Sequence, residues 1–242
     1  MWIPERWLST ECIAAALGHP PHAIGIPLLR NPTLDRWFAR AHPALPALLY
    51  LPLAIGLLVY ALRRGAGAST VLVGVLSGWL AFSLAEYVVH RFYFHRPVGE
   101  TRGARIDAFL THGYHHTYLH DRTRLVMPPM VSVPLAAGLA LVLLPLLGAL
   151  GAALFAGVLV GYVAYDSLHY ATHHVHANRG PLGFLRRYHL LHHGIGHGAR
   201  FGVSSPVWDI VFGTYPRPHR RARARGRKPA PSTGGLRSHG AG

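Results

Sequence analysis

Four apolar stretches divide the chain into membrane-length segments separated by polar connections. The first two span about residues 44–62 and 69–89, and each is near the ~20 residues that a helix needs to cross a ~30 Å hydrocarbon core. The third and fourth share one uncharged run, Val131 to Tyr165, which is too long for a single crossing. This run predicts a helical hairpin that turns near Gly148 and Gly151. The pattern therefore predicts an all-α integral membrane protein with about four transmembrane helices in two hairpins.

Two further regions are expected outside the apolar stretches. Residues 1–43 include Trp2, Trp7 and Trp37 and predict an N-terminal segment along the membrane interface, although packing into the core is an equally good interpretation. Residues 44–215 form the predicted membrane-embedded domain. Residues 216–242 predict a disordered basic tail attracted to anionic headgroups, with nucleic-acid binding as the less favoured interpretation.

The charged residues support a membrane protein and set its orientation. Only 14% of residues are charged, below the roughly 25% of soluble domains, and the net charge is +15. Twelve of the 24 Lys and Arg residues follow the fourth stretch, and six arginines lie between the second and third. The positive-inside rule places both termini and the middle loop, as a helical cap, in the cytosol. Arg63 and Arg64, in the first hairpin turn, weakly oppose this orientation.

Ten of the 19 histidines form four clusters near the ends of the apolar stretches or in the cytosolic segments. They are His90 and His95; His112, His115 and His116; His169 and His173; and His189, His192 and His193. Positions i, i+3 and i+4 share a helix face, so each HxxHH triplet can aim three imidazoles at one point. The five-residue spacing of His90 and His95 requires the helix to end or bend between them. Imidazole binds Fe, Zn, Cu or Ni, and ten ligands predict two metal ions with about five each.

The remaining candidate residues are assigned around these clusters. Glu86 lies four residues before His90 and Asp166 three before His169, so we expect each carboxylate to hold the other ring nitrogen of its histidine. The nine other histidines are interpreted as non-ligands. Cys12 is the only cysteine, which excludes an internal disulfide and a cysteine-based metal site.

The clusters and their surroundings resemble the fatty acid hydroxylase superfamily of membrane-bound, histidine-rich di-metal oxygenases. The likeness covers roughly residues 80–215, and "RLVMPP" is more similar to the fatty acid 2-hydroxylase branch than to the sterol desaturases. It lies in "EYVVHRFYFH" (86–95), "HGYHHTYLHDRTRLVMPP" (112–129), "YDSLHYATHH" (165–174), "YHLLHH" (188–193) and "FGVSSPVWDIVFGT" (201–214).

The resemblance implies the chemistry. It implies that the ten clustered histidines bind two iron ions, which zinc can replace in purified protein, and that Tyr165 and Asp166 are catalytic residues beside them. It also implies O2-dependent hydroxylation at C2 of the acyl chain of a fatty acid or a sphingolipid such as ceramide. The cytochrome b5 haem motif of some relatives is not found in this sequence. Electrons are therefore expected from a separate cytochrome b5-like or ferredoxin-like protein.

Two alternative functions are considered, and the composition indicates in which membrane the protein lies. A sibling enzyme that modifies sterols or carotenoids would share the histidine clusters. A metal transporter would need ligands near the bilayer midplane, and the run from 131 to 165 contains none. The abundance of Ala, Gly, Arg and Pro is typical of a GC-rich bacterial genome and predicts a bacterial inner membrane.

Overall fold

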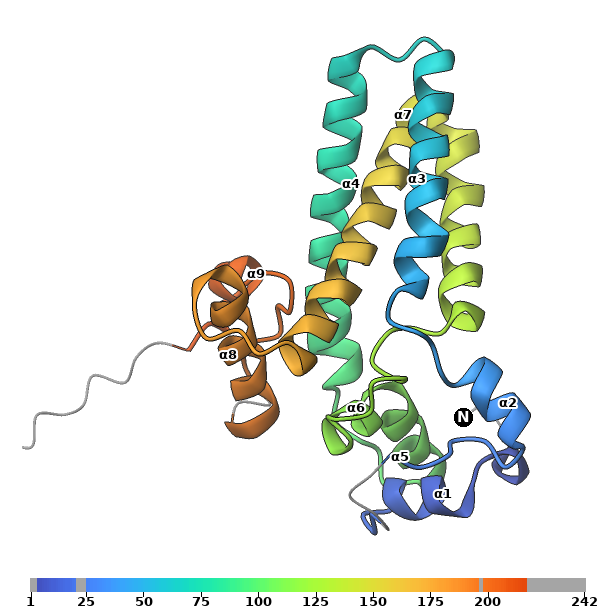
Figure 1. Ribbon diagram of the computed structural model, residues 1–242, viewed down its shortest axis with the longest axis vertical. Helices are drawn as coiled ribbons and strands as arrows, with labels where there is room; N and C mark the ends of the chain where they lie inside the picture. Colours follow the sequence, from blue (N-terminus) through green and yellow to red (C-terminus); the bar gives the residue numbers. More distant parts are fainter. Residues whose placement is uncertain (1–3, 21–24, 196–197, 217–242) are drawn as a thin grey trace, which may run out of the picture.

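The computed structural model describes residues 4–20, 25–195 and 198–216. The regular secondary structure of this part of the chain is entirely helical, apart from one isolated β-bridge. Three helices are long and apolar enough to cross a membrane (Figure 1). They are α3 (Leu45–Arg63), α4 (Ala68–Val88) with its continuation η2 (Val89–Phe94), and α7 (Pro129–His174). The chain is thus a multi-pass membrane protein. The tail predicted from residue 216 onward lies almost entirely outside the described residues.

Helix α7 folds back on itself at a glycine. Its 46 residues would extend ~69 Å if straight, about twice the thickness of a hydrocarbon core. Gly148 has φ 51° and ψ −123°, which is outside the helical region and suits a residue without a side chain. A Cβ on Gly151 would lie 2.2 Å from the Leu143 carbonyl oxygen, so the turn also needs glycine there. In Figure 1 the two limbs of α7 therefore lie side by side, against α3 and α4.

Glycines also bring α4 close to the second limb of α7. A Cβ on Gly78 would lie 2.0 Å from the Leu154 carbonyl oxygen, and one on Gly157 would lie 2.1 Å from the Val75 carbonyl oxygen. Small residues allow this backbone-to-backbone approach, the usual way that helices associate where lipid removes the hydrophobic driving force. The buried core of the bundle comprises Tyr50, Ala54, Phe155, Ala156, Leu159, Tyr162 and Val163.

Short helices form a cap at one end of the bundle (Figure 1). They are η1 (Glu5–Trp7), α1 (Thr10–Ala16), α2 (Pro32–Phe38), α5 (Arg102–Ala108), η3 (Phe109–Gly113) and α6 (Tyr114–Thr117). Leu8, Cys12 and Ile26 of the N-terminal segment are buried against Phe109 and Tyr114. The N-terminal segment therefore contributes to the core of the cap, and its position along the membrane interface stays a prediction.

A buried polar network ties this N-terminal segment to the loop after α6. The Arg124 guanidinium forms an ion pair with Asp35, and their side chains are only 3% and 4% exposed. Arg124 also donates to the Ile26 carbonyl at 2.6 Å, and Tyr114 donates to Asp121 at 2.6 Å. Because buried charges are costly to leave unpaired, this network fixes the loop behind η3 and α6.

Two further helices follow α7. Helix α8 (Gly180–Ile195) packs against α7, and α9 (Val207–Val211) lies against α4. The Trp208 indole donates to the Ser83 hydroxyl of α4 at 3.0 Å, which holds α9 beside the apolar bundle. Ile210 and Val211 of α9 are mostly exposed.

Candidate metal centre

The structure brings the ten clustered histidines together in two groups of five. Within each group, one ring nitrogen from every histidine lies within 4.8 Å of the others. The first group contains His90, His95, His112, His116 and His192, and the second contains His115, His169, His173, His189 and His193. The other histidines that the structure describes, among them His174 and His176, belong to neither group. His22, His197, His219 and His239 lie outside the described residues.

A π-helix explains the five-residue spacing of His90 and His95. Segment η2 is a π-helix, in which hydrogen bonds join residues five apart, and the His95 amide donates to the His90 carbonyl at 3.2 Å. This wider turn returns position i+5 to the face of position i. The two Nε2 atoms consequently lie 3.2 Å apart. The sequence predicted that the helix ends or bends between His90 and His95. The structure instead shows a continuous helix that widens into a π-helix there.

Each HxxHH triplet is divided between the two groups, contrary to the expectation of one common point per triplet. His112 and His116 face the first group, while His115 faces the second. On α8 the order is reversed, because His189 and His193 face the second group and His192 the first. Positions i+3 and i+4 differ by ~100° around a helix, so a helix that passes between two centres supplies both.

The nitrogen distances fit bound metal ions. Neighbouring Nε2 atoms are 2.9–3.2 Å apart in the first group and 2.9–3.0 Å apart in the second. Ligands ~2.1 Å from a common ion lie ~2.9 to 3.4 Å apart, depending on the angle between them. Several imidazole nitrogens that face one another cannot all be satisfied by shared protons, since each neutral ring carries one N–H. A cation in each group would satisfy all of these lone pairs.

The protonation state of the cap and α8 histidines suits this role. Burial lowers the pKa of His112 and His115 well below the usual value, and neighbouring imidazoles lower it further. The pKa of His189 is lowered in the same way, first by burial and then by His169. These rings are therefore neutral near pH 7, the form of imidazole that binds a metal.

Backbone carbonyls, and not carboxylates, hold two of the rings by their other nitrogen. His90 Nδ1 bonds to the Phe201 carbonyl, and His192 Nδ1 bonds to the Ala199 carbonyl at 2.7 Å. A proton held on Nδ1 leaves the Nε2 lone pair for a metal. The expected pairing of Glu86 with His90 is therefore wrong. So is that of Asp166 with His169, whose Nδ1 has no hydrogen-bond partner among the described residues.

Glu86 and Asp209 instead hold the loop that supplies these carbonyls. Glu86 accepts hydrogen bonds from the amides of Val203 and Ser204 at 2.6 and 2.9 Å and from the Ser204 hydroxyl. Asp209 accepts from the amides of Phe201 and Gly202, both at 2.8 Å. Sequence reasoning missed the loop because its contribution is made by the backbone. The only signal was its place in the stretch "FGVSSPVWDIVFGT".

Tyr165 and Asp166 lie beside the second group. The Tyr165 ring centroid is 5.6 Å from that of His169. Asp166 is only 2% exposed, and its Oδ2 has no hydrogen-bond partner within the described part of the chain. A buried carboxylate oxygen without a partner is unusual and is a candidate for an interaction with a substrate or a bound ion.

Comparison with known proteins identifies the same region of the chain. The family model for fatty acid hydroxylase matches residues 75–214. The chain is 36% identical over 172 residues to the dihydroceramide fatty acyl 2-hydroxylase FAH2 of Arabidopsis thaliana, covering 69% of this chain and 71% of that protein. It is 44% identical over 144 residues to the ceramide very long chain fatty acid hydroxylase SCS7 of Saccharomyces cerevisiae, covering 57% and 36%.

A solved structure extends the likeness to the fold. The structure described as "Full length scs7p (only hydroxylase domain visible)" superimposes with a TM-score of 0.73 at 34% sequence identity. The match covers 81% of this chain and 74% of that chain. The two chains therefore share the same overall fold over the matched length.

Proposed function

This chain belongs to the fatty acid hydroxylase family, and from that premise we propose that it is a membrane-bound oxygenase that hydroxylates C2 of a lipid acyl chain. The observation that carries the proposal is the pair of five-histidine groups at the end of an apolar bundle. The substrate class rests on relatives that are named as a dihydroceramide fatty acyl 2-hydroxylase and a ceramide very long chain fatty acid hydroxylase.

The ten histidines would hold two iron ions, and these would supply the activation of O2 that amino acid side chains cannot perform. The protein's own contribution is to orient the imidazoles. Phe201 and Ala199 fix two rings through their carbonyls, and burial keeps the cap rings neutral. Tyr165 and Asp166 would contact the reacting end of the substrate. The Tyr165 ring lies between His169 of the second group and Phe82 of the bundle, and Asp166 has a buried oxygen without a hydrogen-bond partner among the described residues.

The overall reaction sets a requirement for a partner. One oxygen atom of O2 is inserted between C2 and its hydrogen to form the hydroxyl group, and the other oxygen atom is reduced to water. The reaction consumes two electrons and two protons. A separate electron-donor protein, cytochrome b5-like or ferredoxin-like, would supply the electrons. The depth of the site favours C2, because a lipid's acyl chain lies in the bilayer while its carboxyl or amide end lies at the interface, level with the ends of the spans.

The membrane arrangement is part of the proposal. Each limb of α7 is long enough to cross, so with α3 and α4 the chain would make four crossings in two hairpins. Arginines gather around the end of the bundle that carries the cap, including Arg91, Arg96 and Arg102. By the positive-inside rule this end faces the cytosol, and in a bacterium the membrane would be the inner membrane.

Lipid mass spectrometry tests the function. Cells that express the wild type are compared with cells that express a His112→Ala, His115→Ala double variant, which removes one ligand from each group. The matched control is His176→Ala, an exposed histidine outside both groups. We expect acyl chains heavier by one oxygen atom, assigned to C2 by fragmentation, in the wild type and the control but not in the double variant.

Other products would change the proposal in defined ways. Oxygen added to sterol-like or carotenoid lipids would move the protein to a sibling branch with the same metal groups. No oxygenated lipid, together with metal bound by the wild type, would overturn the enzymatic function.

A further inference from the structure

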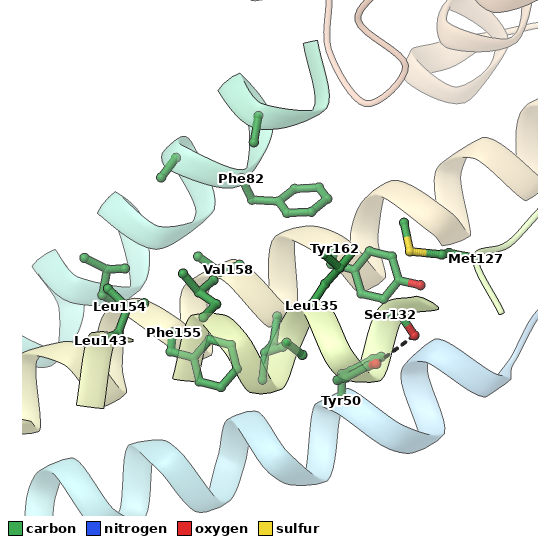
Figure 2. A pocket seen from close by; sticks show the side chains of 15 residues that line it. Tyr50, Phe82, Met127, Ser132, Leu135, Leu143, Leu154, Phe155, Val158 and Tyr162 are labelled. Carbon is green, nitrogen blue, oxygen red and sulfur yellow. Dashed lines mark hydrogen bonds between the residues drawn. The ribbon is translucent and has the colours of Figure 1, made fainter. Parts of the chain in front are cut away.

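An apolar cavity of about 390 Å³ lies between α3, α4 and both limbs of α7 (Figure 2), and it is open along one side, where Leu135 of its wall is 62% exposed. We name it the tail chamber. Its walls include Phe82 of α4, Leu135 and Leu143 of the first limb, and Leu154 and Val158 of the second. Within the part of the chain that the structure describes, no charged side chain lines it. Such a cavity suits a hydrocarbon chain and not a polar ligand.

The few polar groups of the tail chamber gather toward one end. The hydroxyl-bearing side chains that line it are Tyr50, Ser132 and Tyr162, and Tyr50 donates to Ser132 at 2.8 Å (dashed line in Figure 2). Ser132 and Tyr162 lie farther from the Gly148 turn than Leu143 and Leu154 do. Leu143 and Leu154 line the opposite end (Figure 2). The chamber is therefore polar at the end near the cap and wholly apolar at the other.

The polar end adjoins the metal centre. The Phe82 ring, which lines the chamber, lies 6.0 Å from the ring of Tyr165, centroid to centroid. Tyr165 in turn lies 5.6 Å from the ring of His169, a member of the second histidine group. Ring contacts through Tyr165 thus connect the wall of the chamber to the second histidine group.

The size of the tail chamber fits most of a long acyl chain. Ser132 and Leu143 are eleven positions apart on one limb, which corresponds to ~16 Å along the helix. An apolar cavity of ~150 Å³ holds one benzene molecule, so 390 Å³ has room for roughly fifteen carbon atoms. At the far end the two limbs converge on the Gly148 turn, and Leu143 and Leu154 narrow the cavity from its two sides (Figure 2).

We propose that the tail chamber receives the distal part of the substrate's acyl chain and that Leu143 and Leu154 limit the chain length that the enzyme accepts. This rests on the proposed acyl hydroxylase function. Lipid is as apolar as the chamber, so steric fit, and not hydrophobic transfer, must select the chain. A chain that is too long meets Leu143 and Leu154 at the narrowed end and holds its C2 short of the metal centre, whereas a shorter chain leaves voids.

Products from substrates of graded chain length test this selection. Purified wild type is given ceramides whose acyl chains differ in length on either side of about fifteen carbons, with reductant and O2. Leu143→Phe enlarges the side chain at the narrowed end by roughly one carbon's volume and extends its reach into the cavity, so it should shorten the preferred chain. Leu143→Ala should lengthen it. The control, Leu141→Phe, alters a side chain that is 76% exposed on the same limb and outside the chamber, and should leave the preference unchanged.

A second variant guards against misfolding. Leu154→Phe fills the same end from the other limb, so a shortened preference in both phenylalanine variants supports the proposal. If correctly folded Leu143→Phe and Leu143→Ala prefer the same acyl-chain length as the wild type, the proposal is overturned.

Photo-crosslinking gives a readout that does not depend on turnover. The probe is a ceramide with a diazirine at the terminal carbon of an acyl chain of about fifteen carbons. Crosslinks on peptides that contain Leu143 or Leu154 support the proposal. Crosslinks confined to bilayer-facing residues such as Leu141 and Leu146 would overturn it and identify ordinary lipid contact. Loss of the proposed function would show as no 2-hydroxy product from any substrate, whatever the crosslinks, so the two failures can be told apart.

Discussion

Single residues orient the histidines either by direct contact or through the loop that makes that contact. The carbonyls of Phe201 and Ala199 touch imidazoles directly, while Glu86 and Asp209 act one step away by fixing the backbone that carries those carbonyls. A carboxylate that accepts several hydrogen bonds orients a loop more firmly than a neutral acceptor does, because its bonds are charge-assisted.

Removing the carboxylate of Glu86 should weaken metal binding. In Glu86→Ala the amides of Val203 and Ser204 and the Ser204 hydroxyl lose their acceptor, so the loop loses its position. We expect metal affinity to fall by about tenfold or more, measured by competition with a chelator. Glu100→Ala, at an exposed glutamate, is the control. Equal metal retention by both variants would show that the loop does not depend on this carboxylate.

The sole cysteine should be unreactive in the folded cap. Burial raises the pKa of the Cys12 thiol from 9.0 to about 12, an effect that Arg124 partly offsets. Because the thiolate is the nucleophile, alkylation by iodoacetamide at pH 8 should be about a hundredfold slower in folded than in denatured protein. The folded-state pKa is above the unfolded value, so this group's contribution to stability is present below about pH 9 and is lost as the pH rises toward 12. Equal alkylation rates by mass spectrometry would contradict the burial.

At the scale of elements, two local departures from the α-helix decide where the histidines point. The π-helix η2 returns His95 to the face of His90, and the π-helix η3 contains His112, the first histidine of the second cluster. Glycines also allow α4 and α7 to cross closely, and this crossing sets the distance between His90 and the second limb of α7.

Substitution at this crossing should separate the two helices. Gly78→Ala would place a methyl group 2.0 Å from the Leu154 carbonyl oxygen, so the backbones must move apart. We expect a loss of about 1–3 kcal/mol of stability, seen as a lower thermal unfolding midpoint in detergent. Gly56→Ala on α3 is the matched control, since a Cβ there meets nothing within 4 Å. A Gly78→Ala midpoint no lower than that of Gly56→Ala would show that the crossing tolerates a wider spacing.

At the scale of the whole molecule, bound metal would cross-link the bundle to the cap and to α8. Each histidine group draws on segments far apart in the chain, the first from η2, the η3–α6 region and α8, and the second from α6, α7 and α8. Ligands that bind only the folded state stabilise it by mass action.

Metal removal should therefore destabilise the whole protein. A metal whose free concentration is about a thousand times its Kd adds ~4 kcal/mol to the free energy of unfolding. Chelation should therefore lower the unfolding midpoint by about 10 °C. The His112→Ala, His115→Ala variant, which lacks a ligand in each group, should respond much less to the chelator. An unfolding midpoint of the wild type that is insensitive to chelation and to added iron or zinc would count against metal sites in these groups.

Much of the molecule could be predicted from its sequence. The apolar stretches gave the spanning helices, and the reversal of α7 falls at the glycines that the uncharged run indicated. The ten clustered histidines were identified by ligand chemistry and spacing, and the family resemblance of the blocks around them is confirmed. These features are local, because hydropathy, helix period and imidazole chemistry belong to short segments of chain.

Only the tertiary structure decided how those histidines are shared and held. The division of each HxxHH triplet depends on α6 and α8 passing between two centres, which spacing within one helix does not reveal. The carbonyl that holds His90 belongs to Phe201, 111 positions away, and any residue type would supply it. The tail chamber likewise exists only where α3, α4 and α7 meet. The sequence by itself thus determined which histidines gather, and packing between distant segments determined which of the two groups each one joins.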